Sequence, residues 1–184
     1  MLKYFIIIFI FIFIIKNTNA NNKENIINNL KNTKNLNFEF EQNINGKIEN
    51  GNCIIEYPKK IFCEYSNSSN KVLVSNGKSL VVKTITSYYR YPLKKTALNL
   101  ILDKNFLINK IYILDEKIID NSYINYKLNE NGNEISIFFD NKTFNLIGWQ
   151  TKDIYQNLNI TFLSSVKKNE PINKNIFKLP SSQN

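Results

Sequence analysis

The sequence predicts a mainly β (α+β) protein, an antiparallel sheet covered on one side by short helices. Most of the chain after residue 35 consists of short segments in which apolar and polar residues alternate, separated by turn residues. One apolar segment with helical spacing precedes all of these segments, and another interrupts them near their midpoint. Strands in two sets with helical cover between them give a curved antiparallel sheet, which encloses either a packed core or a cavity.

The first 20 residues have the layout of a secretory signal peptide. Lys3 precedes an apolar run from Tyr4 to Ile15, and Thr18-Asn19-Ala20 offers a small-residue cleavage site. The run has 12 residues, whereas a membrane-spanning helix needs about 20. We therefore expect cleavage after Ala20 and a single domain over residues 21–184. The alternative is an uncleaved anchor, which Lys16 favours because it interrupts the approach to the cleavage site.

The chain is basic, with 24 Lys and Arg residues against 15 Asp and Glu residues. Its formal net charge of +9 becomes +7 when Lys3 and Lys16 leave with the signal peptide. A positive excess favours anionic membrane surfaces or acidic partners. The lysines are scattered instead of forming a block, however, so a solvated surface is the stronger interpretation and no nucleic-acid partner is expected.

The mature chain opens with a helix followed by a strand. From Asn22 to Lys34, apolar residues at helical spacing predict a short amphipathic helix, with Ile26, Ile27 and Leu30 on one face. Strict alternation then predicts a half-buried strand whose inward-facing residues are Leu36, Phe38, Phe40, Gln42 and Ile44.

The stretch from Cys53 to Cys63 predicts a hairpin folded about Pro58. In this register Cys53 lies opposite Cys63 and Ile55 lies opposite Ile61. The face that we expect to be interior carries Cys53, Ile55, Tyr57, Ile61, Cys63 and Tyr65.

The same register predicts a disulfide between Cys53 and Cys63. Directly opposed positions on antiparallel strands have Cα atoms about 4.5 to 5.5 Å apart, which is within disulfide range. A secreted chain also meets oxidising conditions. Nine residues separate the two cysteines, so the C-x-x-C pattern of redox motifs is absent. Two separately buried thiols are the alternative.

The remaining elements follow in order along the chain. Asn76-Gly77 predicts a tight hairpin turn between Val72–Val74 and Leu80–Val82. Thr96 is the expected N-cap of a helix over Ala97–Leu102. A second short apolar segment covers Phe106–Ile108, and strands are then expected over residues 111–119, 123–128, 135–139, 144–151 and 156–163.

The residue inventory excludes several kinds of active site. The chain contains no histidine, which removes Ser-His-Asp and Cys-His nucleophile systems and the commonest metal ligand. Two cysteines alone cannot complete a structural zinc site, and no phosphate-binding glycine motif occurs. Glu39 and Glu41 fall on the polar face of their strand, where solvation explains them. We therefore expect no metal, no cofactor and no catalytic residues.

Several motifs together resemble the outer-membrane lipoprotein carrier family of the periplasm (LolA-type). They are Phe40-Glu41-Gln42, Tyr57-Pro58, the run from Val74 to Leu80, and Thr96 at the start of a leucine-rich helix. The resemblance spans most of the mature chain and agrees with the order of elements.

The resemblance implies an unclosed antiparallel barrel with helices forming a lid over an apolar cavity. It implies a monomeric periplasmic carrier that takes acylated lipoproteins from an inner-membrane ABC transporter to an outer-membrane receptor, without a cofactor. Cavity-lining residues would be Leu36, Phe38, Phe40, Ile55, Tyr57 and Ile61, although these residues also suit an ordinary core. The lid would carry Leu98, Leu100, Ile101, Leu102 and Phe106.

The chain departs from the family pattern in two places. The family often has an arginine before the proline that is Pro58 here, where it bonds to the lid, and this chain has Tyr57. The family also tends to have proline after the threonine that begins the lid helix, and this chain has Ala97.

Three other functions fit the same residues. One is a carrier of a free lipid or glycolipid on the same half-barrel. Another is an envelope enzyme that uses Asp103, Asp115 or Asp120, and the last is a structural or adhesive surface protein that binds nothing small. For this last function, Asn67, Asn141 and Asn159 begin glycosylation-type triplets.

Overall fold

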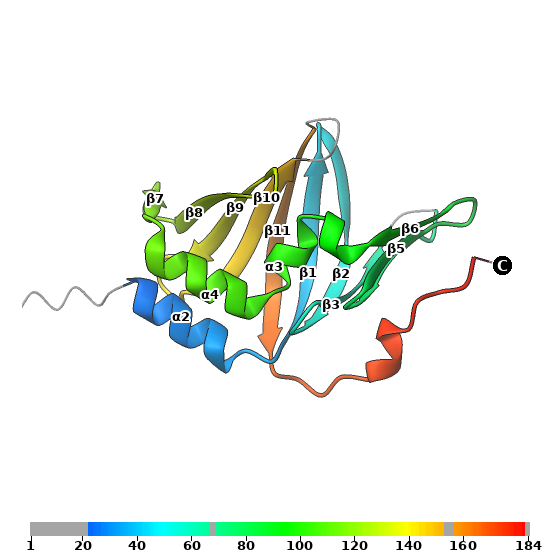
Figure 1. Cartoon of the computed structure of the whole chain (residues 1–184), viewed down its shortest axis with the longest axis horizontal. Helices are drawn as coiled ribbons and strands as arrows, with labels where there is room; N and C mark the ends of the chain where they lie inside the picture. The colour runs from blue at the N-terminus through cyan, green and yellow to red at the C-terminus, as the bar shows by residue number, and fades with distance from the viewer. Residues whose placement is uncertain (1–21, 67–68, 153–156, 183–184) are drawn as a thin grey trace, which may run out of the picture.

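The computed structural model describes residues 22–66, 69–152 and 157–182 (Figure 1). The expected signal peptide, over residues 1–20, and residue 156, where the last expected strand begins, lie outside these residues. Within the ranges described, no helix combines the length and the apolar character that crossing a membrane requires.

One antiparallel sheet of eleven strands dominates the described part of the chain. Its strands are β1 (Asn35–Ile44), β2 (Lys47–Glu56), β3 (Lys60–Tyr65), β4 (Val72–Asn76), β5 (Ser79–Lys83), β6 (Tyr88–Pro92), β7 (Lys117–Ile119), β8 (Tyr123–Glu130), β9 (Asn133–Asp140), β10 (Leu146–Lys152) and β11 (Leu158–Lys168). The order is β6-β5-β4-β3-β2-β1-β11-β10-β9-β8-β7, so the first and last strands pair at the centre. Strands β6 and β7 form the two edges, and the sheet is not closed, as predicted.

Helices cover the concave face of this sheet (Figure 1). They are α2 (Asn22–Asn32), α3 (Leu98–Ile101) and α4 (Lys104–Ile113), with short 3-10 turns η2 (Leu93–Lys95) and η3 (Lys174–Phe177). Helix α2 buries the predicted face of Ile26, Ile27 and Leu30 and packs against α4. Helix α4 begins where the Asp103 side chain accepts a hydrogen bond from the Phe106 amide at 3.1 Å.

The hairpin that the cysteines predict has the expected register. Cys53 pairs with Cys63, Ile55 with Ile61 and Glu56 with Lys60. Alternation therefore directs the two cysteines and the two isoleucines to the interior, where at most 4% of each is exposed.

The Asn76-Gly77 turn also forms, and the two residues stabilise it in different ways. Gly77 adopts the positive φ of 93° that a tight turn requires. Asn76 does not share this conformation; its side-chain oxygen accepts hydrogen bonds from the amides of Lys78 and Ser79, each at 3.0 Å. The asparagine thus stabilises the turn through its side chain.

Two local predictions were wrong. Thr96 does not cap a helix with its side chain, because its hydroxyl donates to the Leu93 carbonyl at 2.8 Å and helix α3 starts at Leu98 without a side-chain cap. The strand expected over residues 111–119 is confined to Lys117–Ile119. Residues 111–113 belong instead to α4, because the buried Ile111 continues the apolar face of Leu107 and Ile108.

Candidate functional site

The space between the sheet and the helices is the candidate functional site, and the predicted lining residues all lie there. Five of them, Leu36, Phe38, Phe40, Ile55 and Ile61, are at most 4% exposed and belong to one apolar cluster. Tyr57 stands at the turn between β2 and β3 and packs against the same cluster. The alternating pattern of β1 to β3 therefore predicted which residues of these strands are buried, and their role in lining a cavity stays a prediction.

The predicted lid residues cover this wall. Leu100, Ile101 and Leu102 are buried in the same cluster, and Leu98 and Phe106 pack against it. They come from α3, from α4 and from Leu102, one of the two residues between these helices. We call α3 and α4 the lid helices. The structure thus brings together two groups of residues that are far apart in the sequence.

The other half of the wall was missed by the sequence analysis. It comes from strands β8 to β11, and its buried members are Ile124, Tyr126, Leu128, Ile135, Ile137, Phe139, Leu146, Trp149 and Leu163. The signal was present, because the same alternation of apolar and polar residues runs through residues 123–128.

The interior is filled by side chains in this form of the protein. The residues of the apolar cluster are between 0% and 8% exposed. Side chains around a hollow wide enough for a hydrocarbon chain would present more surface than this to a molecule the size of water. The structure therefore shows a closed form, in which the lid helices pack directly on the sheet.

The lid is tied to the β2–β3 turn by Lys59. Its backbone amide donates to the Leu102 carbonyl at 2.9 Å, and its ammonium group lies 3.1 Å from an Asp103 carboxylate oxygen. Both partners lie at the junction of α3 and α4, so one residue holds both lid helices. We call this pair of contacts the lid latch.

Tyr57, at the position where the family often has arginine, makes no such tie. Its hydroxyl oxygen is buried and has no hydrogen-bond partner in the part of the chain that the structure describes. Burial raises the pKa of this hydroxyl far above its usual value. The Lys104 ammonium of α4 lies 5.9 Å from the centre of the Tyr57 ring. The hydrogen bond and the ion pair from this turn to the lid come instead from Lys59, two residues further on, and sequence reasoning had not singled out this lysine.

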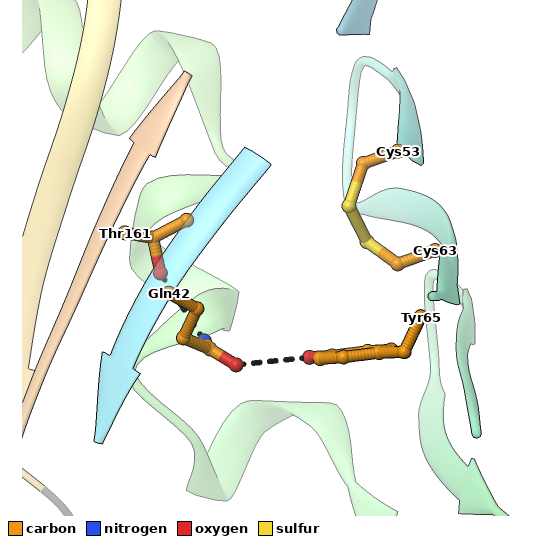
Figure 2. The surroundings of a disulfide bond; sticks show 5 residues. All are labelled: Gln42, Cys53, Cys63, Tyr65 and Thr161. Atoms are coloured by element: carbon orange, nitrogen blue, oxygen red, sulfur yellow. Dashed lines mark hydrogen bonds between the residues drawn. A yellow bond between two sulfur atoms is a disulfide. The ribbon is translucent and has the colours of Figure 1, made fainter. Parts of the chain in front are cut away.

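The predicted disulfide is present on the interior face. Cys53 and Cys63 are bonded, with Cα atoms 4.1 Å apart. Figure 2 shows the polar residues beside it: the Tyr65 hydroxyl donates to Gln42 Oε1 at 3.1 Å, and Gln42 Nε2 donates to Thr161 Oγ1 at 3.2 Å. These bonds join β3, β1 and β11 where the apolar wall ends.

A buried carboxylate lies near this polar layer. Only 7% of the Glu49 side chain is exposed, and it forms ion pairs with Lys71 and Lys47. The Lys71 ammonium also lies 3.9 Å from the centre of the Tyr65 ring. Burial raises the pKa of Glu49, but hydrogen bonds and charge attraction from Lys71 and Lys47 outweigh it, so the pKa lies below its usual value.

We expect Glu49 to make the stability of the protein depend on pH. A carboxyl group with a lower pKa in the folded state adds stability above its unfolded pKa of about 4.3, and loses it as pH falls through the folded value. Urea unfolding at a series of pH values should show the wild type losing more stability below about pH 5 than Glu49→Gln does. The exposed Glu64→Gln is the control. Parallel curves for wild type and Glu49→Gln would contradict the assignment.

The geometry offers little for catalysis. Asp103, one of the carboxylates considered for an enzyme, is occupied as the cap of α4 and the partner of Lys59. In the described ranges, no three carboxylate or cysteine side chains gather closely enough to hold a metal ion. What the site does offer is apolar surface on both of its walls.

Comparison with known proteins identifies this architecture. The family model of the outer membrane lipoprotein carrier protein LolA matches residues 18–180. The chain belongs to the LolA family. Members of this family are carrier or binding proteins for lipids or lipoproteins rather than enzymes. The disulfide of this member fits an oxidising compartment.

Solved structures with similar folds have low sequence identity to this chain. MucB is 8% identical with a TM-score of 0.49, over 88% of this chain and 63% of the MucB chain. A LolA superfamily protein from Nitrosomonas europaea is 9% identical with a TM-score of 0.42, over 85% and 97% of the two chains. The lipoprotein LppX of Mycobacterium tuberculosis is 11% identical with a TM-score of 0.44, over 83% and 95%. A search of curated proteins finds no match.

Proposed function

We propose that the protein is a periplasmic carrier that shields the acyl chains of lipoproteins between its sheet and its lid helices. It would accept them from an inner-membrane lipoprotein-releasing ABC transporter and pass them, as a monomer, to an outer-membrane receptor. The observation that carries this proposal is the distribution of polarity at the site. The contact between the lid helices and the sheet is apolar at its centre. Two ion pairs lie at its edge, the lid latch and a 2.6 Å pair between Lys110 of α4 and Glu130 of β8.

An apolar contact with charged groups at its edge suits a compartment that opens to bind acyl chains. Covering an acyl chain is worth about 0.8 kcal/mol for each buried methylene, so an uncovered chain stays in its membrane. If the lid helices move off the sheet, both newly exposed surfaces are apolar, and acyl chains can replace the contacts that the helices lose. A closed, filled form keeps these surfaces away from water when no cargo is bound.

The proposal includes delivery to the periplasm. The signal peptide over residues 1–20, cleavage after Ala20 and a single carrier domain over residues 21–184 all belong to it. The disulfide between Cys53 and Cys63 supports export, because such bonds persist in oxidising compartments.

Native mass spectrometry tests the cargo directly. Mature protein released gently from the periplasm of cells that make lipoproteins should include a population heavier by one acylated lipoprotein. A population heavier by a free lipid or glycolipid would favour that cargo instead. Bare protein alone, in cells whose lipoproteins reach the outer membrane, would contradict the carrier function.

Loosening the lid latch should speed cargo loading. Asp103→Asn removes the ion pair with Lys59, yet asparagine still caps α4, so the lid helices stay folded. A partly exposed ion pair is worth about 0.2 to 1 kcal/mol, which corresponds to loading of a triacylated lipopeptide roughly 1.5 to 5 times faster.

Stopped-flow fluorescence with a labelled lipopeptide measures this rate. Glu134→Gln is the control, because it removes ion pairs of Glu134 on β9 with Lys127 on β8 and Lys152 on β10, and neither pair involves the lid helices. Equal rates for Asp103→Asn and the control would show that the ion pair of the lid latch does not limit opening.

A further inference from the structure

A pocket of about 380 Å³ lies beside the C-terminal segment, at the ends of β3 and β4. Its walls are formed by Lys60, Asn76, Lys174, Phe177, Lys178 and Leu179. Ile61 faces the interior, so strand alternation places its neighbour Lys60 on the outer face of the sheet. The pocket is therefore separate from the apolar site beneath the lid helices.

Phe177 fixes the wall of this pocket in place. After β11 the chain turns back along the sheet toward β3 to β5, as the orange and red segment of Figure 1 shows. There η3 packs against β3 and β4, and Phe177 is only 4% exposed without being part of the interior cluster. The Lys60 ammonium lies 5.7 Å from the centre of the Phe177 ring. The pocket is thus preformed, with an aromatic residue among its lysines.

Positive charge predominates at the pocket. Three lysines contribute to its walls. The Glu56 carboxylate approaches two of them, at 2.8 Å from the Lys60 ammonium and 4.0 Å from the Lys174 ammonium. A single carboxylate neutralises one unit of charge, so these four side chains together carry a net positive charge. A ligand that supplies further carboxylates would complete the pairing.

We propose that this pocket docks an acidic segment of a partner protein. Carboxylates of the segment would pair with the three lysines, and an apolar side chain would contact the half-buried Leu179. Charge complementarity favours an acidic segment, because its carboxylates can form hydrogen-bonded ion pairs with the lysine ammonium groups. The proposal concerns the outer face of the sheet and holds whatever cargo the interior carries.

The pocket adjoins the turn that carries the lid latch. The Ser75 hydroxyl donates to the Lys59 carbonyl at 2.9 Å, and the next residue, Asn76, lines the pocket. Lys60 likewise follows Lys59 directly. A docked partner would therefore sit beside the residue that holds the lid closed.

Binding of a labelled peptide of glutamates and leucines to the cargo-free mature protein tests the proposal. The triple variant Lys60→Gln, Lys174→Gln, Lys178→Gln should bind at least about tenfold more weakly. Lys117→Gln, Lys142→Gln, Lys167→Gln removes the same net charge from exposed residues that do not line the pocket, and it should bind within about twofold of wild type. Lysine-to-arginine changes at the three pocket positions should preserve binding.

Several results would overturn the proposal. Equal weakening in both glutamine variants would assign the effect to net charge. Loss of binding in the arginine variant would show that positive charge is not what the peptide recognises. Binding to phosphatidylglycerol vesicles that falls in the pocket variant, while peptide binding is unchanged, would make the pocket a membrane contact. Circular dichroism of each variant establishes that the sheet is folded.

Discussion

Replacing Cys53 and Cys63 together by alanine is expected to lower the free energy of unfolding by somewhat under about 3 kcal/mol. The disulfide joins residues 10 apart in the sequence, and it restricts the unfolded chain to conformations in which the β2–β3 hairpin stays closed. Both cysteines are only 4% exposed, so alanines at these positions gain no contact with water that would offset the loss of the bond.

Urea unfolding of the oxidised wild type, the reduced wild type and the double variant measures this effect. The reduced wild type should lose a similar free energy, and the variant should not respond to reductant. A thiol titration of the denatured, unreduced wild type should find no reactive cysteine. Two reactive thiols, or a variant as stable as the oxidised wild type, would contradict the structural role of the bond.

The sequence predicted the structure best in β1 and in the β2–β3 hairpin. There, regular alternation or the positions of the two cysteines left a single interpretation. In β1 the alternation of apolar residues admitted one interpretation, and the strand runs over Asn35–Ile44 with Phe38 and Phe40 inside. In the next hairpin, Pro58 and the two cysteines fixed the register, since only one pairing places Cys53 opposite Cys63.

The prediction failed where the local pattern fitted both a helix and a strand. Ile111-Tyr112-Ile113 alternates like a strand, yet it forms the last turn of α4. Burial of Ile111 against the interior decides between the two, and Tyr112 and Ile113 are left 58% and 74% exposed. That contact depends on how α4 lies on the sheet, which no local window of sequence contains.

The lid latch could not be read from the sequence at all. Lys59 and Asp103 are ordinary charged residues in a chain that has many, and only the folded chain places their charged groups 3.1 Å apart. Only half of the interior wall was predicted, for a related reason. Its residues follow local alternation, but the two halves are joined by the pairing of β1 with β11, which is a long-range contact that local alternation does not reveal.

Phe38→Ala is expected to have the largest effect on stability, a loss of about 3 to 5 kcal/mol in the cargo-free protein. Phe38 is 2% exposed, and its ring meets that of Trp149 edge-on with centroids 6.4 Å apart. Removing the ring takes away its contact with Trp149 and leaves a cavity in a filled interior.

Phe162→Ala, the same chemical change on the opposite face of the sheet, is the matched control. Phe162 is 43% exposed and stacks on Phe138, so its loss should cost about 1 kcal/mol or less in urea unfolding. If the interior of the cargo-free protein were an open hollow, Phe38 would already contact water and the two variants would be similar. A large difference between the two losses of stability would identify a filled interior. A ligand that binds the folded state raises its stability. Stabilisation of Phe38→Ala by a lipopeptide would therefore show that acyl chains occupy the space that the ring leaves.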